Sequence, residues 1–301
     1  MTGHCVVVVP LYTPGSEVRA AVAAMAAQAP LILVDDGSGP AFDKILDELR
    51  RLQGVHLIAR PTNDGIATAL NHGVRRAIDL GADVVITMDQ DCLPAPGFVS
   101  AIRDAVSAAT GHVAIGPGRL NGEPVAPGAG TGTSAVPVTC IFQAGMTMRA
   151  DTFELLGGLD ESLFIDAVDT DLCLRLRALG GEVLVVPDLD LTHALGASDA
   201  ARRVQLGPFR PTATFHSPER RYYITRNTLR VIARHAPHEP RWAAMATRRL
   251  AAATALAMTV EDCRPAKLAA ITAGLVDALR RRTGPRPASP PLRRLRSRAA
   301  S

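Results

Sequence analysis

Residues 84–92 (VVITMDQDC) restrict the possible folds more than any other stretch of the chain. Four apolar or β-branched residues lead into two carboxylates one residue apart, and Pro94 and Pro96 follow at once. A continuous apolar run that ends in this way is typical of a buried strand in a parallel sheet. Open α/β sheets bind ligands at the carboxyl ends of their strands, and residues two apart in an extended chain point the same way. The segment therefore predicts that Asp89 and Asp91 face one site at the sheet edge, with an ordinary acidic turn as the alternative.

Strand and helix patterns alternate along the chain before that segment. Buried-strand patterns occupy residues 4–11, 31–34 and 55–59, and helical patterns occupy 17–28, 42–52 and 66–80. This order predicts an α/β fold with a mostly parallel, Rossmann-like sheet flanked by helices. No GxGxxG or Walker motif follows the first strand, so both nucleotide-binding fingerprints are absent. Further on we predict a helix at 98–109, a loop at 121–137 over the active edge, and strands at 113–115, 139–148 and 182–186, the last ended by Pro187.

Composition divides the chain into three parts. Residues 1–210 carry the α/β pattern and are predicted to form one domain. Residues 211–282 are basic and predict helices at 218–235, 241–260 and 265–282, and the Arg- and Pro-rich residues 283–301 are predicted to be disordered. The charge is divided as well: residues 1–200 hold 12 Lys and Arg against 24 Asp and Glu, and residues 201–301 hold 21 against 5. Different surfaces are therefore expected to meet different partners.

Several classes of protein are disfavoured by composition. Aromatic residues make up only 4% of the chain, which argues against a stacking platform for single-stranded nucleic acid. The five cysteines are scattered without a CxxC pair, which fits a reducing compartment and neither a disulfide framework nor a structural zinc site. Neither a signal-peptide pattern nor an apolar run long enough to span a bilayer is found. We expect a cytoplasmic protein, with peripheral attachment to the inner face of the cell membrane as a further hypothesis.

Four motifs in order make the chain similar to a known family. They are VDDGS at 34–38, NDGIATALNHG at 63–73, MDQDC at 88–92 and LFIDAVDTDLCLRLRALGGEVLVVPDLDLTHALG at 163–196. The chain resembles the family 2 glycosyltransferases of the GT-A fold, most closely the bacterial rhamnosyltransferase subgroup, and RRYYITRN at 220–227 matches a helical extension common in that subgroup. The resemblance implies an inverting transfer of a sugar from a nucleotide-sugar to an acceptor hydroxyl, assisted by Mg²⁺ or Mn²⁺.

The resemblance also implies roles on the donor side of the site. Either Asp35 or Asp36 would hydrogen-bond the pyrimidine base, with Asp36 favoured, although a turn or helix-capping Asp is common. Asp89 would hold the ribose and Asp91 the metal, and His193 would complete the metal shell or contact the diphosphate. A hard divalent cation on oxygen ligands neutralises the charge that develops on a diphosphate leaving group. Gly65, Asn71 and Gly73 either shape the donor pocket or serve helix capping and packing.

Three carboxylates compete for the role of general base, which must take the proton of the acceptor hydroxyl. Asp169 aligns with the second acid of the family's acidic pair, and Val168 stands in place of the first. Asp166 is the second choice. Asp171 is expected to point elsewhere and to cap the helix or pair with Arg175 at i+4.

The expected reaction is the transfer of a sugar, L-rhamnose from dTDP-rhamnose, to a cell-envelope glycan or lipid-linked acceptor. Another UDP- or dTDP-sugar is the nearest alternative. A sugar-phosphate nucleotidyltransferase would need a Gly-rich, basic loop after the first strand, which residues 13–15 do not supply. A catalytically inactive relative is disfavoured by the retained Asp89, Asp91, Asp169 and His193.

A protein of another class would bind nucleic acid or a membrane through the basic C-terminal half. The acidic front half and the absence of a helix-turn-helix or zinc signature argue against a nucleic-acid partner. Residues 265–282 place Leu268, Ile271, Leu275 and Leu279 at helical spacing, followed by three arginines. This pattern predicts either an interfacial helix on an anionic membrane or a helix packed on the catalytic domain.

Overall fold

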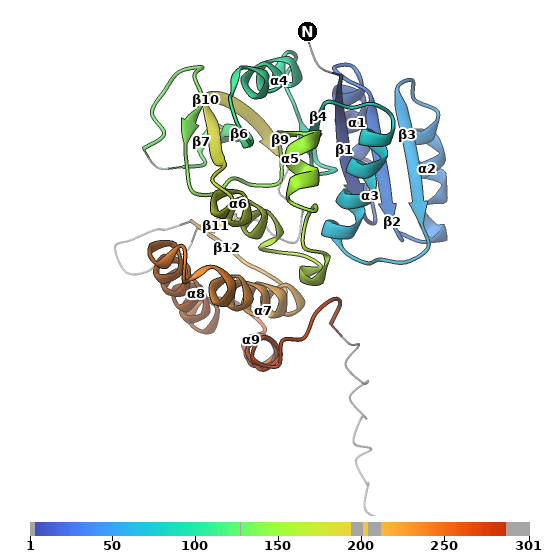
Figure 1. The fold of residues 1–301 in the computed structure, drawn as a ribbon. Coiled ribbons are helices and arrows are strands. Elements are labelled where there is room, and N and C mark those ends of the chain that lie inside the picture. Colours follow the sequence, from blue (N-terminus) through green and yellow to red (C-terminus); the bar gives the residue numbers. More distant parts are fainter. Residues whose placement is uncertain (1–3, 127, 194–200, 204–211, 287–301) are drawn as a thin grey trace, which may run out of the picture.

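The computed structural model describes residues 4–126, 128–193, 201–203 and 212–286, and within them the chain forms a mixed sheet with helices on both faces and three helices after it (Figure 1). The sheet has ten strands, and eight of them follow the order β3-β2-β1-β4-β9-β6-β10-β5. The predicted α/β class with flanking helices and a C-terminal helical region is confirmed. The sheet as a whole is mixed, whereas a mostly parallel sheet was predicted.

The first half of the sheet is parallel and follows the predicted alternation. Its strands are β1 (Cys5–Leu11), β2 (Leu31–Asp36), β3 (Val55–Arg60) and β4 (Val84–Thr87), joined by α1 (Val18–Ala26), η1 (Pro40–Phe42), α2 (Asp43–Arg50) and α3 (Ile66–Asp79). Every residue of β1, β2 and β4 is buried, because helices cover both faces of these strands. The carboxyl ends of β2, β1 and β4 therefore lie side by side at one edge.

The second half of the sheet is mixed. Its strands are β5 (Cys92–Leu93), β6 (Val113–Leu120), β9 (Met146–Arg149) and β10 (Glu182–His193), with the short β7 (Glu123–Pro124) and β8 (Val136–Pro137) inside the predicted loop. β9 runs antiparallel to both β4 and β6, and it is shorter than the strand predicted at 139–148. β6 and β10 are parallel.

The prediction that Pro187 ends the strand at 182–186 is wrong. β10 continues to His193, and its register on β6 shifts between Val186 and Asp190. The irregularity accommodates a residue that has no N–H to donate to the ladder. β10 then pairs with β5, with His193 opposite Cys92. The continuation places His193 beside the segment that follows β4.

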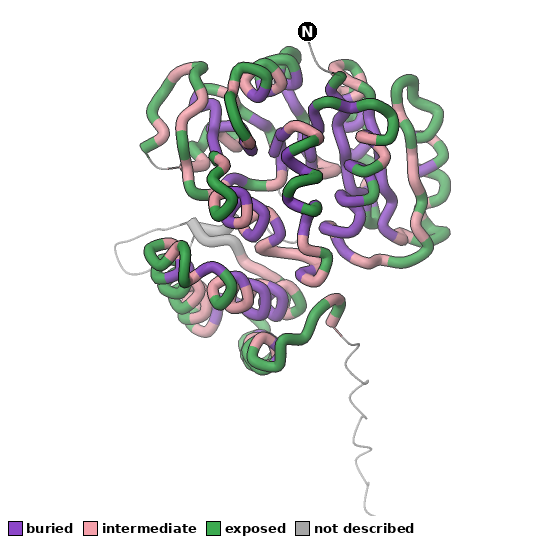
Figure 2. The backbone as a smooth tube through the Cα atoms, viewed as in Figure 1, coloured by how far each residue is buried: buried purple, intermediate pink, exposed green. Residues whose placement is uncertain are grey.

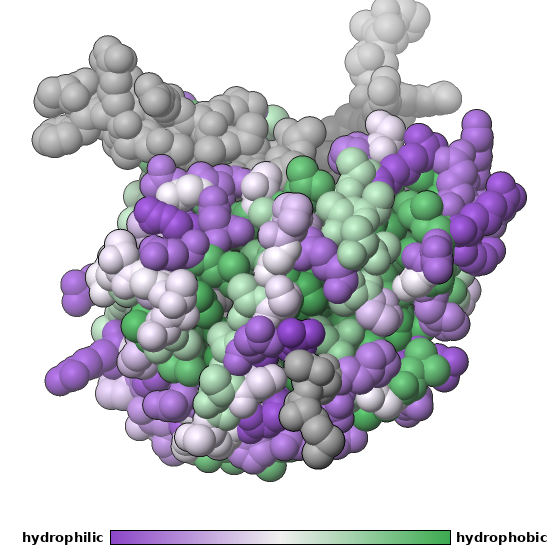
Figure 3. Space-filling model, turned by 90° about the horizontal axis from the view of Figure 1, so that it is seen from above, coloured by the Kyte–Doolittle hydropathy of each residue, from purple (hydrophilic) through white to green (hydrophobic). Residues whose placement is uncertain are grey.

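Two hydrophobic layers fix the helices to the sheet, and the strands between them are largely buried (Figure 2). Val6 and Val8 of β1 pack in the layer of α3, α5 (Ala150–Leu155) and α6 (Val168–Ala178). Val7 and Val9 pack in the layer of α1, α2 and α4 (Phe98–Ala108). Full burial of each such side chain stabilises the fold by about 1.5–3 kcal/mol. Seen from above, the surface intersperses small groups of hydrophobic side chains with hydrophilic ones (Figure 3).

The C-terminal region contains α7 (Pro218–His235), α8 (Pro240–Thr259) and α9 (Arg264–Leu279), close to the predicted ranges, and the short pair β11 (Ala201–Arg203) and β12 (Thr212–Thr214) precedes them. Ser217 caps α7 by accepting from the N–H of Arg220. The predicted tail, 283–301, begins with a packed segment, since the N–H of Arg286 donates to the hydroxyl of Tyr223 at 2.7 Å. Residues 287–301 of that prediction lie outside the described residues. No helix in the described ranges combines the length and apolarity needed to cross a membrane.

Candidate active site

Asp89, Asp91 and His193 meet at the edge of the sheet. The carboxylates follow β4, and the register of β5 on β10 brings the histidine to them. The Nε2 atom of His193 lies 2.9 Å from Oδ2 of Asp89 and 3.2 Å from Oδ1 of Asp91. Ligand atoms of these three residues and of Cys92 all lie within 4.8 Å of one another. The structure thus brings Asp89 and Asp91 together with His193, which lies 104 positions after Asp89 in the sequence.

Burial and mutual charge set the electrostatics of this group. Burial raises the pKa of Asp91, the His193 charge opposes that shift, and the neighbouring Asp89 charge adds to it. Burial lowers the pKa of His193, but the hydrogen bond to Asp89 and the charges of both carboxylates outweigh it, so the net shift is upward. The site therefore has negative potential and favours a cation.

The donor atoms fit a hard divalent cation. Cys92 is fully buried, and burial raises the pKa of its thiol well above the usual value. Sulfur is also a soft ligand that hard cations such as Mg²⁺ disfavour. Two carboxylates and one imidazole remain as possible ligands, and oxygen-rich sets of this kind suit Mg²⁺ or Mn²⁺.

Asp35 and Asp36 are both buried at the carboxyl end of β2. Asp35 accepts hydrogen bonds from the backbone and hydroxyl of Ser38. Asp36 accepts from Nη1 of Arg60 at 2.6 Å, and from the backbone N–H groups of Asp64 and Gly65 at 3.2 and 2.8 Å. Burial raises the pKa of Asp36, and these donors partly offset the shift. Asp36 thus fixes the turn that starts α3.

Tyr12 was not recognised from the sequence as a site residue. It follows β1, between the ends of β2 and β4, and its backbone N–H donates to Oε1 of Gln90 at 3.0 Å. Gln90 Nε2 in turn donates to the carbonyl of Tyr12 at 3.4 Å. The ring is 49% exposed, in a chain with few aromatic residues. An aromatic directly after the first strand was the signal that could have identified it.

Asp169 lies in the first turn of α6, and Asp166 lies in the turn before the helix. Burial raises the pKa of Asp169, the backbone N–H groups of Thr170 and Gln143 oppose the shift, and the Asp166 charge adds to it. Gln143 also links this carboxylate to the end of β4, because its carbonyl accepts from the hydroxyl of Thr87 at 2.7 Å. The candidate base is therefore near the Asp89–Asp91 segment.

The turn that carries Asp166 is conformationally strained. Phe164, Asp166 and Ala167 all have positive φ angles, 67°, 63° and 63°. For residues other than glycine this conformation costs about 1–3 kcal/mol each and persists only where neighbours hold it. Oδ2 of Asp166 is buried without a hydrogen-bond partner among the described residues, whereas Oδ1 accepts from Arg220 Nε at 3.3 Å.

Two side chains of α7 hold this turn. Asn227 Nδ2 donates to the carbonyls of Leu163, Ile165 and Asp166 at 2.7, 2.5 and 3.2 Å. Arg226 Nη2 also donates to the Leu163 carbonyl, at 3.0 Å. Both side chains are fully buried. The C-terminal region therefore supports the turn before the candidate base.

Gly65, at the start of α3, meets the same turn from the other side. It has a φ of 96°, and a Cβ atom there would overlap the backbone of Phe164. Asn71 Nδ2 donates to the carbonyl of Leu159 at 2.9 Å, and Asn71 Oδ1 accepts from the N–H of Leu159 at 2.8 Å. Gly73 lies against Val8. These contacts favour the packing interpretation of the three residues.

Asp171 is a structural residue. Its side chain is fully buried, accepts from Arg175 Nε and Arg234 Nη1 at 2.8 Å each, and lies 3.0 Å from His235 Nε2. The predicted pairing with Arg175 is confirmed. A carboxylate with three partners is not free to take a proton from a substrate.

Comparison with known proteins identifies the family. The family model for "Glycosyl transferase family 2" matches residues 6–126. A protein of Shigella flexneri, dTDP-rhamnosyl transferase RfbF, is 32% identical over 206 residues, which cover 64% of this chain and 68% of that protein. The chain belongs to the family 2 glycosyltransferases.

Solved structures agree with this fold for the glycosyltransferase. The mannosyltransferase PcManGT from Pyrobaculum calidifontis, in complex with GDP-Man and Mn²⁺, matches with a TM-score of 0.59 at 16% identity, over 92% of this chain and 87% of that one. GalNAc-T7 with UDP, GalNAc and Mn²⁺ matches with a TM-score of 0.52 at 17% identity. This match covers 64% of this chain and 44% of that chain. The GT-A-like fold expected from the resemblance is thus confirmed.

Proposed function

We propose that this glycosyltransferase transfers L-rhamnose from dTDP-rhamnose to a hydroxyl group of a cell-envelope glycan or lipid-linked acceptor, with inversion at the anomeric carbon and with Mg²⁺ or Mn²⁺. The observation that carries the proposal is the meeting of Asp89, Asp91 and His193 at the sheet edge. Asp169, in the first turn of α6, is linked to the end of β4 through Gln143. The name of the Shigella relative supports the choice of donor.

Asp91 and His193 would hold the cation, and Asp89 would hold the ribose of the donor. The Mn²⁺ in the complexes of PcManGT and GalNAc-T7 supports a divalent ion here. The ion, when bound, would neutralise the charge that develops on the diphosphate as it leaves. The roles of Asp91 and His193 differ from that of Asp89, so their variants should separate metal binding from nucleotide binding.

The base of the donor would lie between β1 and β2. A carboxylate has about four acceptor sites. Asp36 uses three of them on Arg60 and the 64–65 backbone, which leaves one for an imide N–H, and Asp35 is the alternative. The exposed ring of Tyr12 is placed to stack on the base, a contact whose loss should raise the KM for the donor.

In the chemical step, Asp169 would accept the proton of the acceptor hydroxyl. The acceptor oxygen then forms a bond to the anomeric carbon, and the bond from that carbon to the diphosphate oxygen breaks, with both electrons leaving on dTDP. Attack opposite the leaving group inverts the configuration. Burial, which raises the pKa of Asp169, makes it a stronger base than an exposed carboxylate.

Residues 1–210 would form the catalytic domain, and residues 211–282 an extension that completes the acceptor side. The extension also supports a membrane-docking proposal, because α9 exposes several leucines and buries two charged side chains. Its packed face carries two charged side chains beside Ala270 and Gly274: Lys267 is 2% exposed, and Asp277 accepts from the hydroxyl of Tyr222 at 2.8 Å. Its outer face presents Leu268, Leu275 and Leu279, which are 53%, 45% and 77% exposed.

Arg280, Arg281 and Arg282 follow this apolar face directly. Each basic residue near an anionic leaflet contributes about 1 kcal/mol. We expect wild-type protein to co-sediment with vesicles of anionic lipid at low salt, and Leu279→Asp to weaken the binding. Leu80→Asp, at a 49% exposed leucine of the catalytic domain, is the matched control. Equal sedimentation of both variants would refute the docking.

A donor panel tests the function itself. Nucleotide-sugars with rhamnosyl, glucosyl, galactosyl and N-acetylglucosaminyl groups are incubated with Mg²⁺ or Mn²⁺, and nucleotide release is measured for wild type, Asp91→Asn and Asp79→Asn. We expect metal-dependent turnover of dTDP-rhamnose that Asp91→Asn abolishes and that Asp79→Asn, on the exposed end of α3, leaves unchanged. Turnover of another UDP- or dTDP-sugar instead would refute the donor assignment, and no turnover of any donor would refute the function.

A further inference from the structure

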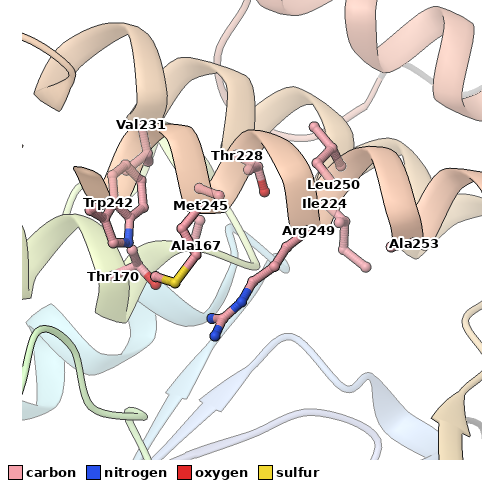
Figure 4. Close-up of a pocket in the computed structure, with 11 residues that line it drawn as sticks. Ala167, Thr170, Ile224, Thr228, Val231, Trp242, Met245, Arg249, Leu250 and Ala253 are labelled. Atoms are coloured by element: carbon pink, nitrogen blue, oxygen red, sulfur yellow. The ribbon is translucent and has the colours of Figure 1, made fainter. Parts of the chain in front are cut away.

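A cavity of about 270 Å³ lies between the start of α6 and the helices α7 and α8 (Figure 4). Ala167 and Thr170 form its wall on the α6 side. Pockets for drug-sized ligands measure about 300–1,000 Å³. This cavity is slightly smaller than that range and has room for one small group such as a sugar ring.

The cavity is one side chain away from the candidate base. Thr170 borders it, and the hydroxyl of Thr170 donates to Oδ1 of Asp169 at 3.3 Å. Ala167 is the residue after Asp166 and belongs to the strained turn. If one group of a ligand is held in the cavity, the adjoining atoms of that ligand would therefore lie next to Asp169, the proposed base.

The lining is mostly apolar, and its few polar groups suit a sugar joined to an anion. Trp242 offers an aromatic surface, and Thr170 and Thr228 offer hydroxyl groups. Figure 4 shows Trp242, Met245 and Arg249 extending from α8 into the space that Ala167 and Thr170 border. Within the described part of the chain, Arg249 has no hydrogen bond or ion pair. A free guanidinium beside an aromatic ring suits a phosphate group attached to a saccharide.

We propose that this cavity is the acceptor subsite and that it binds a saccharide linked to a phosphate or diphosphate ester, the lipid-linked form of the acceptor. The proposal rests on the proposed function. Trp242 and the threonines contact the sugar, and Arg249 contacts the phosphate. The α7–α8 pair thus selects the acceptor, whereas the sheet edge selects the donor.

The chain supplies its own reporter for this site, because Trp242 is the single tryptophan among 301 residues. The probe is a synthetic undecyl diphosphate ester of N-acetylglucosamine, titrated into the full chain while tryptophan emission is recorded. The comparison ligands are the undecyl glycoside without diphosphate and undecyl diphosphate without sugar. We expect a saturable change of emission with the complete probe and about tenfold weaker binding of each comparison ligand, the value of one charge-assisted hydrogen bond or more.

Arg249→Gln is the test variant, and Arg248→Gln is its matched control, since Arg248 is exposed on the same helix but does not border the cavity. We expect Arg249→Gln to weaken binding of the probe about tenfold, with no change for the glycoside that lacks diphosphate, and Arg248→Gln to bind as wild type. Equal binding by all three proteins, or no emission change up to millimolar probe, overturns the assignment.

Donor turnover is measured on the same proteins. Metal-dependent nucleotide release by Arg249→Gln at the wild-type rate, together with weakened probe binding, supports the subsite. Normal donor turnover without any change of Trp242 emission on addition of the probe overturns the subsite and leaves the proposed function intact. Absence of donor turnover in wild type refutes the proposed function instead.

Discussion

The side-chain nitrogen of Asn227 lies 2.5 Å from the carbonyl oxygen of Ile165. This hydrogen bond, with two more from the same nitrogen to Leu163 and Asp166, attaches α7 to the turn before the candidate base. The turn holds three residues at positive φ. Asn227 is therefore a positioning residue, which acts on Asp166 and Asp169 through the backbone and touches no reacting atom.

Replacing Asn227 should affect the rate more than donor binding. We expect Asn227→Ala to lower kcat about tenfold or more, since small displacements of a positioned group are costly, and to lower the free energy of unfolding by about 1–3 kcal/mol. The KM for the donor should stay near the wild-type value, because the proposed donor site is at the carboxyl ends of β2 and β4. Steady-state kinetics and urea unfolding give both quantities. A change confined to stability, with unaltered kcat, would contradict a positioning role.

The two candidate bases can be separated by amide substitution. Asp169→Asn should lower kcat about 10²–10⁴-fold, the usual contribution of general-base catalysis, and should leave nucleotide binding intact. Asp166→Asn should have the smaller effect, because Asp166 is engaged by Arg220. If Asp166→Asn proves the more damaging of the two, the roles must be exchanged.

The pH dependence follows from the direction of the Asp169 shift. Burial raises its pKa above the ordinary 3.8, and the base works only when deprotonated. The acid limb of kcat/KM should therefore lie above pH 3.8, with activity increasing as pH rises through the raised pKa. Asp166→Asn removes a neighbouring negative charge, so it should lower the Asp169 pKa and move the acid limb to lower pH. An acid limb that stays in place in this variant would show that the two carboxyls do not interact.

Removal of divalent metal should abolish transfer and leave the fold intact. We expect EDTA to stop nucleotide release and Mn²⁺ or Mg²⁺ to restore it. His193→Ala should weaken Mn²⁺ binding by about tenfold or more, since even outer-shell ligand partners contribute this much. Calorimetric titration of Mn²⁺ into both proteins measures the difference. His72→Ala, at an exposed histidine of α3, should bind Mn²⁺ as wild type.

The local patterns of this sequence predict most of the fold because they act over short distances. The strand that ends at Thr87 and the helix from Pro218 to His235 each have their own periodicity and boundary residues. The extension of β10 past Pro187 depends instead on a register with β6 and β5, which no local pattern reveals.

Among the site residues, the family motifs identify Asp89, Asp91, Asp169 and His193 as candidates. They do not identify Asn227 as the support of a turn 61 to 64 positions away, because that contact depends on how α7 packs. The positive φ angles at Asp166 and Ala167 are equally hidden, since neither residue is a glycine. Long-range packing alone fixes these features.

The buried carboxylate of Asp171 makes the two parts of this chain inseparable. It belongs to α6 of the α/β domain, yet Arg234 and His235 of α7 are two of its three partners. A chimera that exchanges everything after residue 210 for the same region of a relative would inherit an unpaired charge unless the incoming helix brings equivalent cations. An exchange of these helices should therefore include α6, the helix that carries both Asp171 and the proposed base Asp169.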